Sequence, residues 1–540
     1  MGIINKKERK DRHPYIQELE ELFRKGRITR REFLARLSAL GITAALSPAL
    51  LSTSVQASTP KKGGRLRFGS ASGSTSDSLD PATMSAMTII NMNYLLRNNL
   101  IEIDHKFNAI PELAESWEAS PGALKWVFKL RKGVEFHNGK TLEANDVIYS
   151  INHHRGEKSK SGAKVLAEAI QDIKADGKDT VIFTLKSGSA DFQYILSDYH
   201  LTISPEGTTD WNKGIGTGGY TLVSFEPGVR CLAKRNPNYW KEGRAHFDEV
   251  EVIGINDPNA RTTALMTGKV DAIDRVERRT APLLKKTAGI ELLNTKGLEY
   301  YEFPMLVDVP PFNNIDVRLA LKHAIDREEM VDKILRGFGA VGNDHPISSI
   351  MKYHAAGLPQ RKYDPDKARF HLKKAGMEGT TFKLHVAEQA FQGAVDAAVL
   401  YKEHAAKAGI KIEVVQESSD GYWDNVWLKK PWCAGAWGGR PTVDMMFSVA
   451  FAADAAWNTA HWKNKRFNEL LLKARAELDE KKRAEMYYEM QELVRDDGGV
   501  VIPMFGNFVE AATTKLQHGP ISGNLEMDNA RAAERWWFES

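Results

Sequence analysis

Cysteine and long apolar runs are scarce in this sequence. Only two of the 540 residues are cysteines, Cys231 and Cys433, which excludes a disulfide scaffold and any multi-cysteine zinc or iron–sulfur site. They stand 202 residues apart in apolar, strand-like segments, so two separate buried thiols are favoured over one disulfide. After residue 57, no stretch reaches the ~18 consecutive apolar residues that a membrane-spanning helix needs.

An excess of charge of one sign is also lacking once the N-terminus is set aside. Residues 1–57 hold 11 Lys and Arg against 6 Asp and Glu, which leaves 63 basic and 64 acidic residues in the rest of the chain. A nearly neutral chain gives no electrostatic indication of nucleic-acid binding, which needs a clustered basic surface, so we expect no nucleic-acid partner. The 42% hydrophobic and 27% charged residues are typical of a folded globular chain, and its length allows about three domains.

Motifs of enzymes and metal sites are missing as well. Residues 214–219 match G-x-G-x-x-G, but a strand follows where a dinucleotide motif requires a helix, so a tight glycine turn is favoured. His153 and His154 are neighbours on a helix, point about 100° apart and chelate one metal poorly, so we expect a solvated helix face. We therefore expect no enzyme, catalytic residue, cofactor or metal site, although acid–base pairs assemble from distant positions.

The N-terminus carries an export signal. Thr29–Leu34 reads TRREFL, a twin-arginine signature, and a weakly apolar stretch from Leu37 to Leu51 follows it. Val55-Gln56-Ala57 is a cleavage site with small first and third residues, so we expect cleavage after Ala57. No cysteine stands there to carry a lipid anchor. These features predict a protein that the twin-arginine machinery exports to the periplasm.

Alternating polarity and helix-start signals predict a mixed α/β chain. The predicted strands are 65–69, 124–130, 181–185, 220–225, 230–235, 250–255, 382–386, 410–416 and 500–505. The predicted helices cover 85–97, a segment that begins at Thr141, 258–267, 317–336, 365–375, 391–408, 465–478 and 480–496. The helix at 391–408 lies between two strands, which implies a parallel pair.

Five groups of short motifs follow one another along most of the chain after residue 57. They are Leu113–Trp117 with Trp126–Lys140 and Ala144–Val147; Gly216–Tyr220 with Arg235–Trp240; Ala264–Asp271; Pro311–Leu321 with Ala324–Arg327; and Tyr363–Arg369 with Lys374–Gly376. In this order they resemble the family 5 solute-binding proteins of ABC importers, the dipeptide/oligopeptide/nickel-binding group.

The resemblance implies an α/β fold of the periplasmic binding protein type II, with two lobes and an extra inserted domain. Domain I would comprise 58–97, 216–300 and 503–540, domain II 98–215, and domain III 301–502. Crossings near 298–307 and 500–505 would form the hinge. Such a monomer closes on its ligand and delivers it to the permease subunits of an ABC transporter, because the ligand contacts both lobes only when they are closed.

The resemblance also implies which residues face the ligand. In this family, the end of the first strand and a segment late in domain III line the binding site. The expected ligand-binding residues are Ser72, Gly73, Asn93, Tyr94, Trp437, Gly439, Arg440, Asp444, Trp457 and Asn458. Trp437 and Trp457 are expected at the ligand, since aromatic walls suit small organic molecules. The remaining tryptophans of this region are expected in the core: Trp423, Trp427, Trp432 and Trp462.

Arg440 stands where typical peptide binders of this family carry an aspartate for the α-ammonium group of the peptide. The planar guanidinium suits a carboxylate. Two interpretations stay open. Arg440 binds a ligand carboxylate, with Asp444 or another acid taking an ammonium group, or Arg440 and Asp444 form an internal ion pair.

The expected function is that of a periplasmic substrate-binding protein for a short peptide or a peptide-like, amino-acid-derived ligand. One alternative is a receptor for an opine-like or other carboxylate-bearing small molecule, which Arg440 suits. A receptor for a metal chelate or haem and a sensor subunit without transport are the others.

Overall fold

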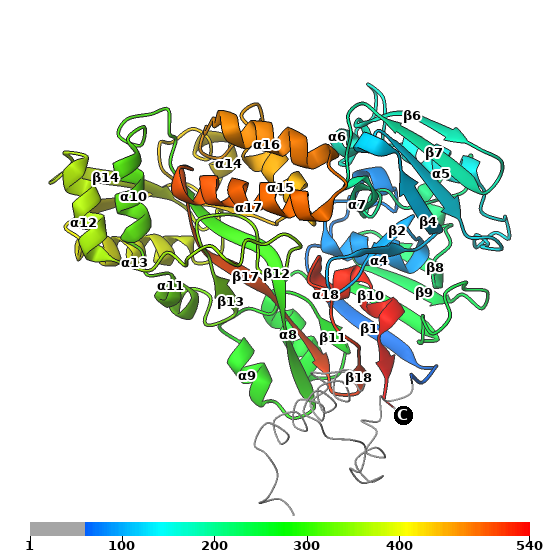
Figure 1. The fold of residues 1–540 in the computed structure, drawn as a ribbon. Helices are drawn as coiled ribbons and strands as arrows, with labels where there is room; N and C mark the ends of the chain where they lie inside the picture. Colours follow the sequence, from blue (N-terminus) through cyan, green and yellow to red (C-terminus); the bar gives the residue numbers. More distant parts are fainter. Residues whose placement is uncertain (1–59, 540) are drawn as a thin grey trace, which may run out of the picture. The chain divides into compact units, whose positions relative to one another are not determined.

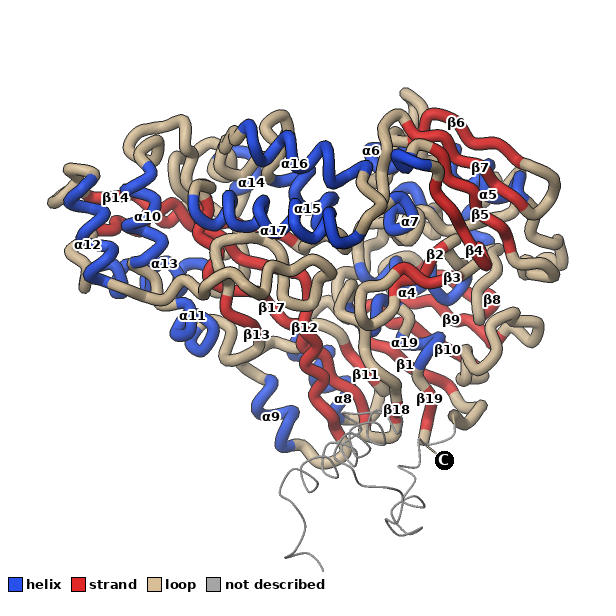
Figure 2. Tube along the Cα trace, in the orientation of Figure 1, coloured by secondary structure: helices blue, strands red, loops and turns tan. Residues whose placement is uncertain are grey.

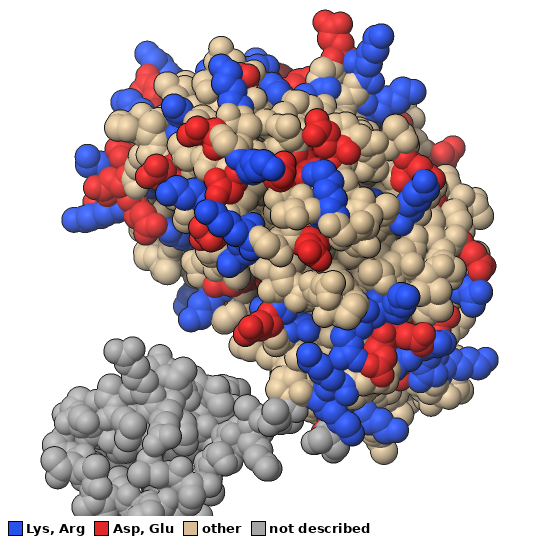
Figure 3. Space-filling model, turned by 90° about the vertical axis from the view of Figure 1, so that its right-hand side faces the viewer, with Lys and Arg blue, Asp and Glu red and all other residues tan. Residues whose placement is uncertain are grey.

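The computed structural model describes residues 60–539 (Figure 1). The predicted signal peptide, with its twin-arginine signature and the cleavage site after Ala57, lies outside these residues. Lys62–Phe538 belong to one unit. In the described part of the chain, no helix combines the length and the apolar character that a bilayer crossing requires. On the face seen in Figure 3, acidic and basic side chains are interspersed.

A nine-stranded mixed sheet occupies the middle of this unit (Figure 2). Its order is β16-β12-β17-β11-β1-β10-β9-β8, with β13 paired to β17. The strands are β1 (Arg65–Ser70), β8 (Tyr220–Glu226), β9 (Arg230–Arg235), β10 (Glu249–Gly254), β11 (Ala272–Ile273), β12 (Ile290–Pro304), β13 (Gly339–Val341), β16 (Gly435–Trp437) and β17 (Val500–Thr513). The central strand β1 pairs in parallel with β10 and β11, so the carboxyl ends of these three strands meet at one edge.

Smaller sheets flank the main one. A four-stranded antiparallel sheet has the order β4-β5-β7-β6, and β14 and β15 form a parallel pair that confirms the predicted β-α-β unit. The strands are β2 (Ile101–Ile103), β3 (Ala109–Pro111), β4 (Ala114–Ala119), β5 (Lys125–Leu130), β6 (Ile170–Ala175), β7 (Thr180–Leu185), β14 (Thr381–Val386), β15 (Lys411–Gln416), β18 (Leu516–Gln517) and β19 (Trp537–Phe538).

Helices connect and cover these sheets. They are α4 (Met87–Leu96), α5 (Ala144–Asn152), α6 (Lys164–Ala167), α7 (Phe192–Ile195), α8 (Pro258–Met266), α9 (Ala281–Lys286), α10 (Ile315–His323), α11 (Arg327–Lys333), α12 (Pro365–Lys374), α13 (Ala394–Ala406), α14 (Tyr422–Asn425), α15 (Val443–Ala450), α16 (Lys465–Ala476), α17 (Glu480–Asp496), α18 (Glu526–Ala530) and α19 (Ala532–Arg535). Short 3₁₀ turns occur at Pro81–Thr83, Pro121–Ala123 and Trp211–Lys213.

Local capping explains where several helices begin. Asp479 accepts hydrogen bonds from Lys481 N and Lys482 N, and α17 therefore starts at the predicted residue. The predicted helix 317–336 is wrong as a single element. The chain leaves the helix after α10, and Asp326 caps a new helix, α11, by accepting a hydrogen bond from Glu329 N.

Two other local expectations have different outcomes. The glycine turn at 214–219 is confirmed, since a Cβ on Gly216 would lie 2.2 Å from Leu96 O and strand β8 follows the turn. The solvated histidine face is wrong. His154 is buried and pairs with Ser161 Oγ at 2.6 Å, while His153 Nε2 lies 2.7 Å from Asp80 Oδ1. Both rings therefore serve local packing.

The long antiparallel pair β12·β17 carries both predicted crossings, near 298–307 and 500–505. Around it, the buried apolar side chains form separate clusters. One cluster takes its buried members only from residues 100–203, whereas another combines residues 66–96, 220–293 and 512–536. The boundaries of the three domains remain a prediction. Cys231 and Cys433 are both buried and unbridged, as expected.

Candidate functional site

The loop after β16 is pressed against strand β12. Trp437 pairs with Tyr300 in the antiparallel register, and Gly439 follows with φ +75°. A Cβ at Gly439 would lie 2.3 Å from Leu298 Cβ, so both the space and the left-handed backbone require glycine. Helix α15 then begins at Val443, because Thr442 Oγ1 accepts a hydrogen bond from Met445 N. Arg440 therefore lies in a short loop between the paired strand β16 and the capped helix α15.

Four tryptophans form a continuous aromatic surface, which we call the tryptophan wall: Trp423, Trp427, Trp437 and Trp457. Trp437 lies at its centre, with ring centroids 6.0 Å from Trp427 and 6.1 Å from Trp457. Trp423 is 37% exposed and Trp457 is 49% exposed. The predicted core positions are therefore correct for Trp432 and Trp462, which are buried, and wrong for Trp423, while half-buried Trp427 joins the wall.

Arg440 lies against this wall without an acidic partner. Its guanidinium carbon is 5.7 Å from the ring centroid of Trp437, and Nη1 donates to Gly439 O at 2.6 Å. Within residues 60–539 it makes no ion pair. Asp444 instead accepts from Arg475 Nε at 3.1 and 3.2 Å, and Arg475 Nη2 also donates to Ser448 Oγ. The internal Arg440–Asp444 pair that the sequence left open is absent.

Buried polar atoms with few partners lie behind the wall. Trp437 Nε1 donates to Glu302 Oε1 at 3.2 Å, while Glu302 Oε2 and the Tyr300 hydroxyl have no hydrogen-bond partner among the described residues. Burial raises the pKa of Glu302 to about 8, against the opposing effect of the Trp437 hydrogen bond. Glu302 is thus largely protonated at neutral pH and does not supply Arg440 with a counter-charge.

Tyr199 lies within electrostatic reach of Arg440. Burial raises the pKa of Tyr199 to about 12 and the Asp198 charge adds to this, while the Arg440 guanidinium opposes it. Tyr199 follows α7 in the segment 98–215, so the charge of Arg440 acts on a residue from a distant part of the sequence.

Ser72 and Gly73 lie on a different part of the molecule, at the carboxyl end of β1. Ser72 Oγ accepts from Arg275 Nη1 at 3.0 Å, and Gly73 N donates to Asn256 Oδ1 at 2.8 Å. Arg275 Nε also donates to Glu526 at 2.8 and 3.0 Å, yet the Arg275 side chain is 47% exposed. Sequence reasoning missed Arg275. Its position two residues after the short strand β11 was the available signal, because ligands bind at the carboxyl ends of parallel strands.

Asn93, Tyr94 and Asn458 are bonded inward. Asn93 Nδ2 donates to Tyr199 O at 3.0 Å, and its Oδ1 accepts from Arg97. Asn458 Nδ2 donates to Trp462 O at 2.6 Å. The buried ring of Tyr94 lies 4.3 Å below the guanidinium carbon of Arg531. The structure thus brings together Trp437, Gly439, Arg440 and Trp457, and gives Asp444, Asn93, Tyr94 and Asn458 internal partners.

In the part of the chain that the structure describes, no group of three or more His, Cys, Asp and Glu side chains is arranged to hold a metal ion.

Residues 108–459 match the profile of the bacterial extracellular solute-binding proteins, family 5 Middle. The chain is 26% identical to the dipeptide-binding protein of Escherichia coli K12 over 452 residues, which cover 75% of this chain and 83% of that protein.

Solved structures show the same fold. The Helicobacter pylori protein DppA in complex with the peptide STSA superposes with a TM-score of 0.71 at 22% identity, covering 89% of this chain and 99% of that one. The protein AgaA of A. tumefaciens R10 in complex with agropinic acid gives 0.69 at 23% identity, covering 88% and 99%. The predicted α/β fold of the periplasmic binding protein type II is confirmed.

Proposed function

The chain belongs to the bacterial extracellular solute-binding proteins of family 5, and on this premise we propose that it is the substrate-binding protein of an ABC transporter. It captures a short peptide or a peptide-like, amino-acid-derived ligand between its lobes and delivers it to the membrane permease. It does so without catalysis, as a monomer. The precursor is exported by the twin-arginine machinery and cleaved after Ala57, and the mature protein works in the periplasm.

The observation that carries this proposal is Arg440 on the tryptophan wall. A half-buried guanidinium with an aromatic neighbour and no acid among the described residues is suited to accept an anionic group from outside. We assign Trp437, Gly439, Arg440 and Trp457 to one side of the ligand. Ser72 and Gly73, with Arg275 beside them, form the other side.

A second candidate ligand is favoured by the same residue. Because Arg440 replaces the aspartate expected for a peptide ammonium group, and because Asp444 is engaged with Arg475, an opine-like or other carboxylate-bearing molecule fits this site. AgaA, which shares the fold, is seen in complex with agropinic acid. No observation favours a metal chelate.

Native mass spectrometry of the mature protein, followed by denaturing extraction, separates the two ligands. A ladder of peptide masses identifies a peptide receptor, whereas one small carboxylic acid identifies the opine-like branch. Arg440→Ala is expected to weaken binding of a carboxylate ligand by ~3–5 kcal/mol in calorimetry, because it leaves a desolvated anion unpaired. Unchanged affinity in a folded variant excludes Arg440 from the site.

The export route has its own test. Replacing Arg30 and Arg31 together by lysine is expected to retain the precursor in the cytoplasm, since the twin arginines form the export signature. A normal periplasmic yield of this double variant contradicts twin-arginine export without affecting the proposal for the ligand.

A further inference from the structure

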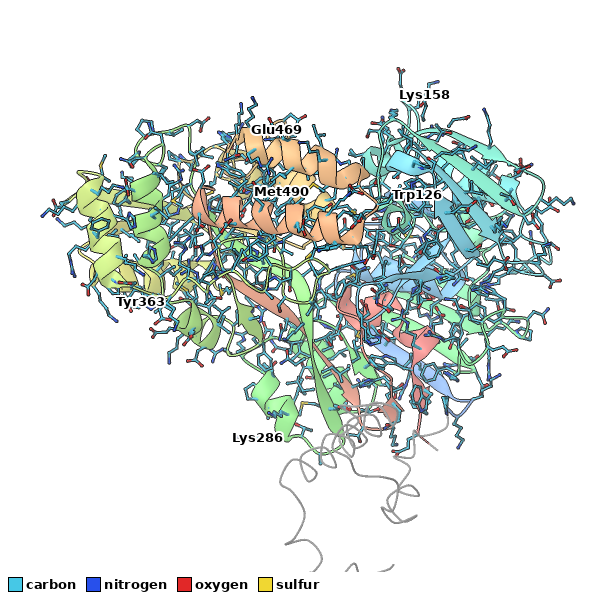
Figure 4. All side chains as sticks on the ribbon, in the orientation of Figure 1. Trp126, Lys158, Lys286, Tyr363, Glu469 and Met490 are labelled. Atoms are coloured by element: carbon cyan, nitrogen blue, oxygen red, sulfur yellow. The ribbon has the colours of Figure 1, made fainter. Side chains whose placement is uncertain are left out.

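Arg275 and Glu526 form an ion pair at the carboxyl edge of the main sheet. Arg275 Nε donates to both carboxylate oxygens of Glu526, at 2.8 and 3.0 Å, and Nη1 donates to Ser72 Oγ, while Nη2 has no partner among the described residues. The Arg275 side chain is 47% exposed and that of Glu526 only 13%. In Figure 4, the labelled Lys286 of α9 lies below and away from the red ribbon of α18, which carries Glu526, so the end of α9 brings no cation to the pair. The cation thus faces outward, and its acid lies mostly inside the fold.

Two further carboxyl groups lie behind Glu526. Asp274, directly after β11, is fully buried and accepts hydrogen bonds from Ser70 Oγ at 2.6 Å and from Ala71 N at 2.9 Å. Glu510 on β17 is also buried; one of its oxygens accepts from the backbone of α18, and Oε2 has no partner among the described residues. Three carboxyl groups that act on one another in a buried site cannot all stay ionised, because burial and like charges both disfavour the charged form.

The protonation of Glu526 is poised near neutral pH. Burial raises the pKa of Glu526 to about 7, the charges of Asp274 and Glu299 add to this, and Arg275 opposes it. Burial also raises the pKa of Glu510 well above its ordinary value. The other charged groups around the pair are Arg261 on α8, Asp274 after β11, Glu299 on β12, Glu510 on β17 and Asp528 on α18. Around pH 7, Glu526 therefore pairs with Arg275 as an ion only part of the time.

The chain holds Glu526 in place independently of Arg275. The next four residues, Met527–Ala530, all have a positive φ, between 53° and 62°. This left-handed turn is bonded to the interior, since Asp528 Oδ1 accepts from Arg535 Nη1 at 2.8 Å. If Arg275 turns to another anion, Glu526 stays among the buried carboxyl groups. A buried carboxylate that has lost its cation becomes neutral by taking up a proton.

We propose that Glu526 is a displaceable counter-ion for Arg275. A ligand carboxylate takes the place of Glu526 on the guanidinium, and Glu526 takes up a proton from the solvent. A carboxylate fits, since Arg275 already holds that of Glu526. The proposal rests on the proposed function, because it concerns the side of the ligand site that contains Ser72 and Arg275. Since the bound state holds more protons than the free state, this side binds a carboxylate more tightly as the pH falls through 7.

A second surface arginine is a matched internal reference. Arg230 is 48% exposed and lies 3.0 Å from Glu226, but the side chain of Glu226 is 51% exposed. The two ion pairs therefore differ in the burial of the acid and not in the exposure of the arginine. Phenylglyoxal modifies accessible guanidinium groups, and mass spectrometry of the labelled peptides gives the rate at each arginine. The ratio of the rates at Arg275 and Arg230 cancels the effect of pH on the reagent.

Labelling of the mature protein tests the release of Arg275. The ratio should be roughly threefold higher, or more, at about pH 6 than at about pH 8.5, because Glu526 is then mostly protonated. Glu526→Gln should give the high ratio at both pH values, whereas the matched control Glu226→Gln should keep the pH dependence at Arg275. A wild-type ratio that does not change with pH overturns the proposal, and this result needs no variant to fold. A pH dependence that survives Glu526→Gln overturns it as well.

Protection by acetate tests the carboxylate-binding role. Acetate is ionised at both pH values, and at about 100 mM it should slow the labelling of Arg275 about twofold at the lower pH, relative to the same concentration of sodium chloride, which corresponds to a Kd of about 100 mM. Protection should be weaker at the higher pH, where Glu526 competes. Arg230 should not be protected, and neutral acetamide should protect neither arginine. If acetate fails to protect Arg275, or protects Arg230 equally, the proposal is wrong.

These measurements separate the inference from the proposed function, because they do not need the natural ligand. If a ligand co-purifies in native mass spectrometry while Arg275 shows no pH-dependent release or no protection, the inference fails and the proposed function stands. If Arg275 is released and protected as expected but the protein carries and binds no peptide or small acid, the proposed function fails, and the displaceable pair remains as a carboxylate site without that role.

Discussion

Two regions of this protein bury charged side chains, and they treat them in opposite ways. In the first region, every carboxylate oxygen of three buried glutamates lies 2.6–3.1 Å from a cationic side chain. The glutamates are Glu102, Glu112 and Glu534, and the cations are Lys241, Arg531 and Arg535. We call these six residues the acid–base network. Behind the tryptophan wall, Glu302 has one hydrogen bond and no cation, and Arg440 has no acid among the described residues.

The pKa values follow from this difference. Burial by itself would raise the pKa of Glu534, but Lys241 and Arg531 outweigh it and bring it to about 2. Burial raises the pKa of Glu302 to about 8 because no cation opposes it. Ion pairing thus keeps a buried acid ionised in the acid–base network, whereas the unpaired acid behind the wall holds its proton. The predictions below test this distinction.

The largest expected effect is on the acid–base network. Arg531→Met leaves Glu112 and Glu534 without one of their partners in a buried site, and we expect the free energy of unfolding to fall by ~3–5 kcal/mol. The matched control, Arg440→Met, should change it by less than ~0.5 kcal/mol, because Arg440 is half-exposed and makes no ion pair among the described residues. Urea unfolding of both variants measures the difference. If the two variants lost the same free energy of unfolding, the ion pairs of the acid–base network would contribute no more to stability than the unpaired Arg440.

Glu302→Gln is expected to act through pH. In the wild type, the folded state holds the Glu302 proton up to about pH 8, while the unfolded state releases it near 4.5. The unfolded state therefore binds fewer protons in this window, and stability falls as the pH rises, by up to ~1.4 kcal/mol per pH unit. Glutamine keeps the acceptor for Trp437 Nε1 without a titrating group.

Unfolding free energies at pH 5, 6.5 and 8 check this prediction. The advantage of Glu302→Gln over the wild type should grow from the lowest to the highest pH. Glu115→Gln, a change at an exposed glutamate, is the control and should show no such trend. A constant difference across the three pH values would mean that Glu302 is ionised in the folded protein.

How far the sequence predicts each region depends on whether its signals are local. Strand β9 and helix α17 were predicted to the residue, because alternating polarity and the Asp479 cap act within a few positions. The full extent of β12 was not predicted, since its pairing partner β17 is remote in the chain, and strand β6 was missed although its partner β7 follows after a short turn. The position of Arg440 followed from the motif resemblance, but its lack of an acid did not.

The partners of charged side chains are the least local property of all. Asp444 binds Arg475 rather than Arg440, across 31 residues, and Arg531 meets Glu112 across 419. No spacing rule distinguishes these pairs from others that the sequence allows. For the same reason Trp423 was expected in the core, although it lies at the exposed end of the tryptophan wall.

A smaller effect is expected from Trp457→Ala. This ring is about half exposed and contacts Trp437, so its loss should change the unfolding free energy by less than ~1 kcal/mol. Affinity for the ligand recovered from the purified protein should fall by ~0.5–1.5 kcal/mol, the usual value of an aromatic contact. Calorimetry and urea unfolding separate the two quantities. A variant that loses stability but not affinity would assign Trp457 to the core.

The smallest effect concerns the two thiols. Burial raises the pKa of Cys231 to about 12, and burial together with the Glu302 charge raises the pKa of Cys433, so neither should react with a thiol reagent in the folded protein. Ser76→Cys, at an exposed position, is the reactive control.

Cys433 lies behind the wall and Cys231 in the cluster that contains Tyr94 and Trp536. Because polar atoms without partners make local opening less costly, labelling under mild urea should reach Cys433 before Cys231, as mass spectrometry of the labelled peptides will show. The reverse order would mean that local opening around Cys433 costs more free energy than local opening around Cys231. The unpaired atoms behind the wall would then not lower the cost of opening.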